Sequence, residues 1–313
     1  MGLVKRWLRQ PKLWITLASL VLIGIALVQQ GGQLREQTLD ARGWWWLLLG
    51  LGISWISILV NGAAWRLLLD WLGHRPAQLD VIPLFVRSNL LKYLPGGIWH
   101  LVERLRVLRS QIGAGPALAA VILDPLLIAA ASVLMIVVGG WQNGLLLVAP
   151  LPALLMVPRW REPILQRLER IKARQFESKG GESLEIETYG SGRGGYPWTP
   201  MAWQLAFVAC RFLGFYCCVF AFKLPDPAWF IWLASFSLAY AVGLVVPGAP
   251  GGLGVFEATL LLRLGSSVAE APLLAVVLSY RVISTLADLL AGGALVVDGA
   301  LLRRFSPSPQ GLS

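Results

Sequence analysis

Long apolar stretches separated by short polar ones dominate this sequence. Six of them come close to the roughly 17–25 residues that a helix needs to cross a membrane: 13–28, 44–69, 117–139, 201–222, 228–247 and 272–297. Two shorter stretches, 144–158 and 252–265, are also apolar, although the second carries Glu257 and Arg263. The pattern predicts an all-α integral membrane protein, a polytopic helical bundle of about eight spans.

The stretch 81–94 is apolar but interrupted by Arg87, Asn89 and Lys92, so we expect an element that enters the membrane to half its depth. The composition agrees with a membrane protein. Hydrophobic residues make up 56% of the 313 residues and charged residues 14%, against roughly 45–50% and 25% in soluble domains. We therefore expect a single integral-membrane domain over residues 1–313.

The net charge of +10 does not point to nucleic acid, because the basic residues are spread along the chain. If the N-terminus is cytoplasmic, 20 of the 27 Lys and Arg residues fall on the cytoplasmic side, as the positive-inside rule requires. We expect a bacterial inner (plasma) membrane protein with both termini in the cytoplasm. The sequence "VQQGGQ" after the first span lacks a signal-peptidase site, which favours a retained anchor.

A polar segment at 159–199 divides the chain into two halves of similar length and is expected to connect them in the cytoplasm. Its part "REPILQRLERIKARQFESK" places apolar residues near helical spacing between basic ones. This pattern fits either a helix on the membrane surface or a solvated linker.

Two similar motifs interrupt the apolar sequence: "YLPGGIWHLVER" at 93–104 and "VPGAPGGLGVFE" at 246–257. Proline and glycine end helices, so each motif predicts a re-entrant or half-length helix. An interrupted helix is tolerated in a membrane only inside protein or beside a water-filled cavity. The N–H groups that open the next helix attract anions. Paired breaks in two halves of a chain are typical of a transporter's binding site, and we expect the two to lie close together.

Four ionisable residues lie within apolar sequence: Asp124, Glu257, Arg281 and Asp288. Each costs about 2.5–3.5 kcal/mol at the centre of a spanning helix, so we expect them to face the interior and to pair. Arg281 and Asp288 share a helix face but lie about 10.5 Å apart along it. Their partners must therefore come from other helices, with Glu257 and Asp124 as candidates. Such pairs either form a working site or only fix the register of the helices.

No catalytic motif is found in the sequence. His74 and His100 lie in unrelated settings, and neither H-E-x-x-H, G-x-S-x-G nor a P-loop occurs. The single G-x-G-x-x-G match at 190–195 has no preceding strand. We expect no enzymatic activity, no cofactor and no metal.

The stretches "SNLLKYLPGGIWHLVERLRVLR", "ALAAVILDPLL", "VVPGAPGGLGVFEATLLLRL" and "SYRVISTLADLLAGG" together resemble the lysylphosphatidylglycerol synthase transmembrane-region (flippase-like) family. The resemblance extends from about residue 10 to 300. It implies a polytopic inner-membrane protein whose relatives move aminoacylated or other anionic-derived lipids between leaflets. Bifunctional synthases of the family carry a soluble aminoacyl-transferring domain after the membrane part, whereas this chain ends in "RRFSPSPQGLS". Synthase chemistry is therefore not expected.

The resemblance also implies a set of substrate-binding positions in the two motifs and in the last span. These are Lys92, Tyr93, Gly96, Gly97, Trp99, His100, Arg104, Gly251, Gly252, Glu257, Arg281 and Asp288, with Asp124 as a possible charge partner. Asn89, Pro95, Pro247, Gly248, Pro250 and Gly254 match the family motifs as well.

We expect a membrane protein that binds an anionic phospholipid or a lipid-linked substrate and translocates it between leaflets, with membrane lipids as its partners. Two alternatives stay open. One is a non-transporting scaffold or accessory subunit, which would tolerate loss of the buried charges if it still folded. The other is a membrane-embedded transferase with Glu257 or His100 as general base, which would need a second polar pocket for a soluble donor.

Overall fold

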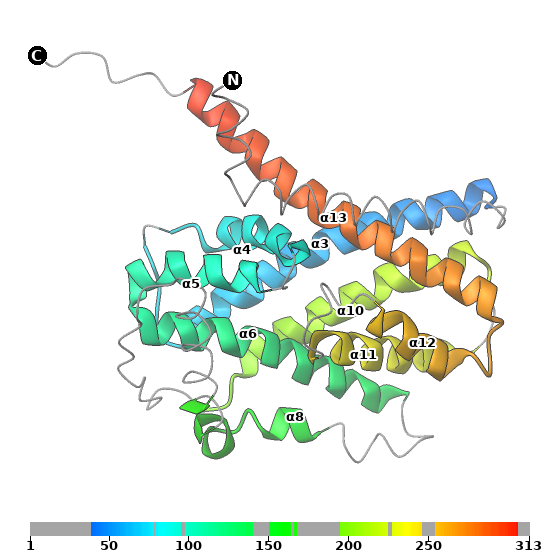
Figure 1. Cartoon of the computed structure of the whole chain (residues 1–313), viewed down its shortest axis with the longest axis horizontal. Coiled ribbons are helices and arrows are strands. Elements are labelled where there is room, and N and C mark those ends of the chain that lie inside the picture. The colour runs from blue at the N-terminus through cyan, green and yellow to red at the C-terminus, as the bar shows by residue number, and fades with distance from the viewer. Residues whose placement is uncertain are drawn as a thin grey trace, which may run out of the picture.

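A computed structural model of the chain describes residues 39–77, 79–94, 98–139, 150–163, 166–167, 195–224, 227–245 and 254–305, with side chains up to residue 295. All regular secondary structure in these residues is helical (Figure 1). The long helices are α3 (Ala41–Trp71), α6 (Ala114–Met135), α10 (Trp198–Ala221) and α13 (Glu270–Phe305). The shorter elements are α4 (Val81–Asn89), η1 (Leu90–Tyr93), α5 (Trp99–Ile112), η2 (Ile136–Val138), α8 (Leu151–Leu154), α11 (Trp229–Val245) and α12 (Val255–Leu264).

Four helices among the described residues are long and apolar enough to cross a membrane: Ala41–Trp71, Ala114–Val138, Trp198–Ala221 and Glu270–Leu295. Each one covers a stretch that the hydrophobic pattern predicts, with ends within a few residues of the expected ones. Large apolar side chains are exposed on their outer faces, for example Leu48, Leu213 and Leu290. The protein is therefore an all-helical integral membrane protein, as predicted.

The predicted number of eight spans is not established by the described residues. The helix α11 has 17 residues, and α12 has 10, which makes α12 about 15 Å long and so about half the thickness of the hydrocarbon core. The stretch 81–94 forms the short elements α4 and η1, consistent with the half-depth element that its polar residues suggest. The stretch 13–28 lies outside the described residues, as do residues 144–149 of the stretch 144–158 and most of the connector 159–199.

Small residues bring α3 and α10 into close contact. A Cβ atom on Gly43 would lie 3.0 Å from the carbonyl oxygen of Ala221, and one on Gly50 would lie 3.0 Å from that of Gly214. On the facing helix, a Cβ on Gly214 would collide with Ser54 Oγ. In a membrane, where apolar burial adds little, close backbone approach through small residues is a main source of helix association. We call this contact the α3–α10 seam.

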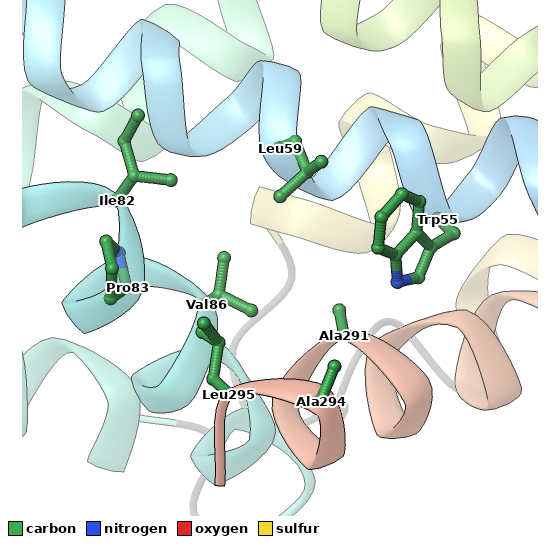
Figure 2. A pocket seen from close by; sticks show the side chains of 8 residues that line it. All are labelled: Trp55, Leu59, Ile82, Pro83, Val86, Ala291, Ala294 and Leu295. Carbon is green, nitrogen blue, oxygen red and sulfur yellow. The ribbon is translucent and has the colours of Figure 1, made fainter. Parts of the chain in front are cut away.

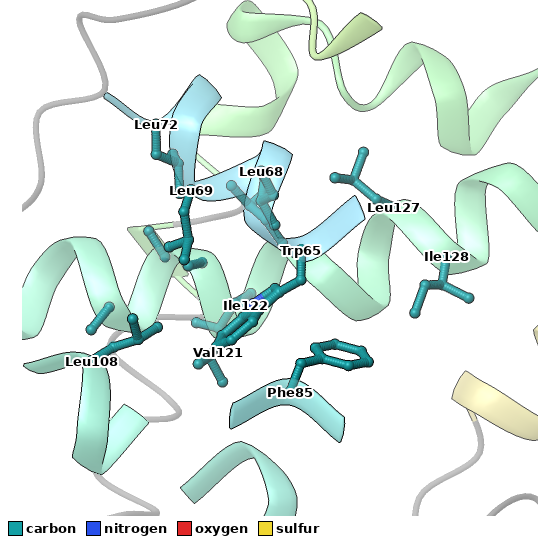
Figure 3. Close-up of a cluster of buried hydrophobic side chains, with 14 of the residues drawn as sticks. Trp65, Leu68, Leu69, Leu72, Phe85, Leu108, Val121, Ile122, Leu127 and Ile128 are labelled. Carbon is teal, nitrogen blue, oxygen red and sulfur yellow. The ribbon is translucent and has the colours of Figure 1, made fainter. Parts of the chain in front are cut away.

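Two large buried apolar clusters, and a smaller third one around Ile58 and Ala287, fill the interior of the described residues. The first lies between α3, α4, α5 and α6 around Trp65 and Phe85, whose ring centroids are 5.5 Å apart (Figure 3). The second joins α10, α11, α12 and α13 around Phe215 and Phe236, with centroids 5.1 Å apart. The polar residues described next lie between and beside these clusters, so water has little access to them.

The turn between α5 and α6 needs a glycine. Gly113 has a φ of 87°, in the left-handed region that other residues rarely adopt, and it both ends α5 and begins α6. Because one residue reverses the chain, α5 folds back along α6. This hairpin brings Arg104 of α5 beside Asp124 of α6.

Candidate functional site

Asp288 of α13 is the centre of the largest polar cluster among the described residues, and its side chain is 1% exposed. Its carboxylate oxygens accept from four groups: Lys92 Nζ at 2.6 Å, the Tyr93 hydroxyl at 2.6 Å, Asn89 Nδ2 at 2.9 Å and Arg211 Nη2 at 3.5 Å. Three of these come from the end of α4 and from η1, directly before the first Pro-Gly-Gly motif. The fourth comes from the middle of α10. We call these five residues the Asp288 cluster.

The Asp288 cluster holds one positive charge more than its carboxylate neutralises, because both Lys92 and Arg211 are cations. Arg211 is almost fully buried, with its side chain 6% exposed. Its Nε atom is also buried and has no hydrogen-bond partner. A buried donor on a charged group is costly to leave unsatisfied. Excess positive charge together with an unused donor favours an anion as the ligand of this cluster.

A second pair, Arg104 with Asp124, is buried on both sides, each side chain being 3% exposed. Arg104 Nη1 donates to Asp124 Oδ2 at 3.1 Å and its Nε donates to Ser88 Oγ at 3.0 Å. The guanidinium also stacks 3.7 Å from the centre of the Phe85 ring. The other carboxylate oxygen of Asp124 accepts from Gln204 Nε2 at 3.0 Å. This pair is neutral and well satisfied, which is the arrangement of a structural ion pair.

Glu257 of α12 and Arg281 of α13 form the third pair. Arg281 Nε lies 2.6 Å from Glu257 Oε1, and Nη2 lies 3.4 Å from Oε2, so the contact is bidentate. Both side chains are less buried than the previous pair, at 15% and 17% exposed. Arg281 also stacks on the Phe256 ring. Glu257 is thus the partner that the sequence suggests for Arg281, whereas Asp124 lies with Arg104 and not with either residue of α13.

The structure places His100 and Trp99 in the first turn of α5, immediately after the first motif. Burial, together with the positive charges of Arg104 and Lys92, lowers the pKa of His100 to about 3. His100 is therefore neutral at physiological pH, and its Nδ1 atom is buried without a hydrogen-bond partner. His100 consequently adds no charge between the Asp288 cluster and Arg104.

The two helices that follow the motifs differ at their N-termini. The N-cap residues, Ile98 for α5 and Gly254 for α12, make no side-chain capping bond. Only α12 has an acidic residue in its first turn, Glu257. Gly254 has a φ of 81°, which explains a glycine there. Gly96, Gly97, Gly251 and Gly252 lie outside the described residues, so the expected proximity of the two breaks stays a prediction.

Comparison with known families gives this polar interior a context. The sequence model of the lysylphosphatidylglycerol synthase TM region matches residues 14–292, nearly the whole chain. The chain belongs to this family. A comparison with curated individual proteins gave no match. Membership in the lysylphosphatidylglycerol synthase TM region family indicates a lipid-related function in the membrane, and it confirms the resemblance that the two Pro-Gly-Gly motifs suggest.

Three residues of the polar interior are not among the positions that the sequence indicates: Ser88, Gln204 and Arg211. The sequence does contain a signal for two of them, Gln204 and Arg211. Gln204 and Arg211 interrupt an apolar stretch seven residues apart, and this spacing puts both on one face of a spanning helix. Among the described residues, no group of His, Cys, Asp and Glu side chains is arranged to hold a metal ion.

Proposed function

We propose that this protein binds an anionic phospholipid or a lipid-linked anion and moves it between the leaflets, with Lys92 and Arg211 engaging the headgroup. The observation that carries the proposal is the excess positive charge of the Asp288 cluster, together with the unused Arg211 Nε donor. A lipid phosphate supplies both the missing negative charge and an acceptor. Guanidinium groups bind phosphate oxygens with good geometry, which suits Arg211 to this role.

The headgroup is proposed to lie at the first motif and not equally at both. The first turn of α5 has no acidic residue, so the positive end of its dipole is not neutralised by its own side chains. The first turn of α12 contains Glu257, which is itself bound by Arg281. The α12 end therefore has less attraction for another anion. We assign Glu257 and Arg281 to the conformational or proton-linked part of the cycle and not to the headgroup.

For the orientation we propose cytoplasmic termini in an inner membrane. Lys223 at the end of α10 lies 2.7 Å from Asp40 at the start of α3, so these ends share one side of the membrane. At the other end of α3, Arg161 stacks on Trp71, 4.7 Å from the ring centre. Arg161 belongs to the basic segment that the positive-inside rule assigns to the cytoplasm. This separation of the ends supports the proposed topology.

We also propose that the protein is not an enzyme and needs no cofactor. A general base must reach its substrate's proton. Glu257 is occupied by a bidentate arginine, and His100 is a weak base because burial lowers its pKa. The transferase alternative therefore has less support than lipid binding.

The test uses purified protein in proteoliposomes that contain a fluorescent anionic phospholipid, with transfer followed by an impermeant quencher. Lys92→Gln removes the excess charge and leaves Arg211 paired with Asp288. We expect this variant to lose at least about tenfold in transfer rate while keeping or raising its melting temperature, a trade-off typical of functional sites. Arg75→Gln, which removes an exposed cation, is the matched control and should transfer at the wild-type rate.

Unchanged transfer by Lys92→Gln would contradict the headgroup assignment. If the wild-type protein moves no anionic lipid and retains none on purification, the accessory-subunit alternative is the better one. Loss of transfer accompanied by a much lower melting temperature would indicate that Lys92 is structural.

A further inference from the structure

An apolar groove lies between α3, α4 and α13 (Figure 2). Its cavity is about 100 Å³, and it is lined by apolar side chains that include Leu59 of α3, Val86 of α4, and Ala294 and Leu295 of α13. The small alanines of α13 leave the space that larger side chains would fill. Leu59 at the groove is 38% exposed, so the groove is open on the outer face of the helices.

The groove continues directly from the Asp288 cluster. Ala291 of the groove follows Asp288 by three residues on α13, and Val86 precedes Asn89 by three residues on α4. Three residues are slightly less than one helical turn, a rise of about 4.5 Å. The same two helices thus carry polar residues at one level and apolar residues at the next.

α13 is held to η1 and α4 at two points beside the groove. Gly292 lets Leu90 pack against α13, because any Cβ at residue 292 would collide with the Leu90 side chain. Farther along, Arg87 donates to the carbonyl oxygen of Leu295 at 3.1 Å. These two contacts fix how α13 lies against α4 and η1 beside the groove.

We infer that the groove holds one acyl chain of the lipid whose headgroup binds Lys92 and Arg211, an inference that rests on the proposed function. A ligand that fills both regions carries an anionic group and an apolar chain joined at a short distance, and this is the chemistry of an anionic phospholipid. An acyl chain gains little free energy on leaving other lipid chains, so the groove contributes fit and placement more than affinity.

The experiment uses a phosphatidylglycerol analogue with a photoactivatable group on one acyl chain, incorporated into vesicles with the full-length protein. After irradiation, labelled peptides are identified by mass spectrometry. We expect labelling of the groove-lining segments of α3, α4 and α13, which excess unlabelled phosphatidylglycerol reduces at least fivefold and phosphatidylcholine does not. The variant Ala294→Trp fills the groove at an exposed position and should abolish this labelling. Leu286→Trp places an indole on the same helix outside the groove and should not.

The outcomes separate the groove from the headgroup site. If Ala294→Trp leaves the competed labelling unchanged, or if labelling is competed equally by phosphatidylcholine, the groove is overturned as a specific chain site. If Lys92→Gln still lowers anionic lipid transfer in that case, the proposed function survives without the groove. If the wild-type protein shows neither competed labelling nor transfer, both proposals fail.

Discussion

Gln204 and Arg211 lie seven residues apart on one face of α10, and each donates a hydrogen bond to a carboxylate on a different helix. Gln204 bonds to Asp124 of α6, and Arg211 bonds to Asp288 of α13. Seven residues correspond to two turns and about 10.5 Å. One rigid helix therefore sets the separation between the neutral Arg104–Asp124 pair and the positively charged Asp288 cluster.

The Glu257–Arg281 pair allows a test that separates function from register. If the pair takes part in the transport cycle, Glu257→Gln and Arg281→Gln each abolish transfer of a labelled anionic lipid in proteoliposomes, with the protein still folded and inserted. The cost in stability should be on the order of 2 kcal/mol, because charged hydrogen bonds of a partly exposed pair are lost. Thermal unfolding measures that cost. The double variant decides: recovered stability with recovered transfer indicates a register-fixing pair, and recovered stability without transfer supports a functional one.

The Arg104–Asp124 pair should be far more important for stability. Asp124→Asn leaves a fully buried guanidinium without its counter-charge and should destabilise the protein by about 3–5 kcal/mol. The conservative variant Arg104→Lys should also lose stability, because lysine cannot both stack on Phe85 and serve two acceptors in fixed directions. The exposed pair Arg75–Asp70 is the control, and Arg75→Gln should change stability by no more than about 1 kcal/mol. Equal melting temperatures for the Asp124 and Arg75 variants would refute this difference.

The α3–α10 seam predicts a specific rescue. Gly214→Ala should destabilise the protein by about 1–3 kcal/mol, because the new methyl group collides with the buried Ser54 Oγ. Adding Ser54→Ala should restore most of the loss, since the remaining Cβ atom is at an ordinary contact distance of 3.6 Å. Gly52→Ala on α3 is the control; it meets no atom within 4 Å and should be neutral or slightly stabilising. Melting temperatures of the four proteins would show the pattern, and an additive loss in the double variant would count against it.

His100 should make stability depend on pH. Its folded pKa of about 3 lies below the ordinary value of 6.5. Between these values the unfolded state binds more protons than the folded state, so stability rises as pH increases from 3 towards 6.5 and is lost on acidification. The melting temperature should therefore fall between pH 7 and pH 5 in the wild-type protein and fall less in His100→Gln. Identical pH profiles for the two proteins would show that His100 is not buried as described.

Cysteine labelling in intact cells tests the topology. A single cysteine at Ser308 should not react with an impermeant maleimide added from outside, because the positive-inside rule puts the C-terminus in the cytoplasm. A cysteine at Lys223 should react, since that residue is 69% exposed and lies at the opposite end of the molecule from Arg161. Outside labelling at residue 308 contradicts the combination of a cytoplasmic N-terminus with an even number of spans.

The spanning helices could be predicted from the sequence because hydrocarbon imposes a simple requirement: about 20 consecutive apolar residues with all backbone groups bonded internally. The partner of Arg281 could also be anticipated, since few acids lie within apolar sequence. Partners that come from outside the apolar stretches could not be predicted in this way. By charge counting, Arg104 belongs with the basic residues of a cytoplasmic segment, yet the hairpin turn at Gly113 buries it against Asp124. Charge counting registers how many basic residues a segment has and not which of them the fold turns inward.

The contacts within the Asp288 cluster could not be predicted from the sequence either. The family resemblance indicates Lys92 and Tyr93 as site residues. That both contact the same carboxylate, Asp288, depends on the packing of η1 against α13. Arg211 looks in the sequence like one of several isolated arginines in apolar stretches. Only the packing of α10 gives it a partner and shows that two cations share one acid.

The α3–α10 seam has a mechanical consequence. The backbones of α3 and α10 touch at Gly43, Gly50 and Gly214, so these helices cannot tilt against each other without a collision of main-chain atoms. They therefore behave as one rigid unit. Arg211 belongs to that rigid unit, whereas Lys92 belongs to the short η1 and Asp288 to the separate helix α13. A rearrangement that exposes the carboxylate first to one leaflet and then to the other would keep the arginine stationary. The moving parts would then be η1, which carries Lys92, and α13, which carries Asp288.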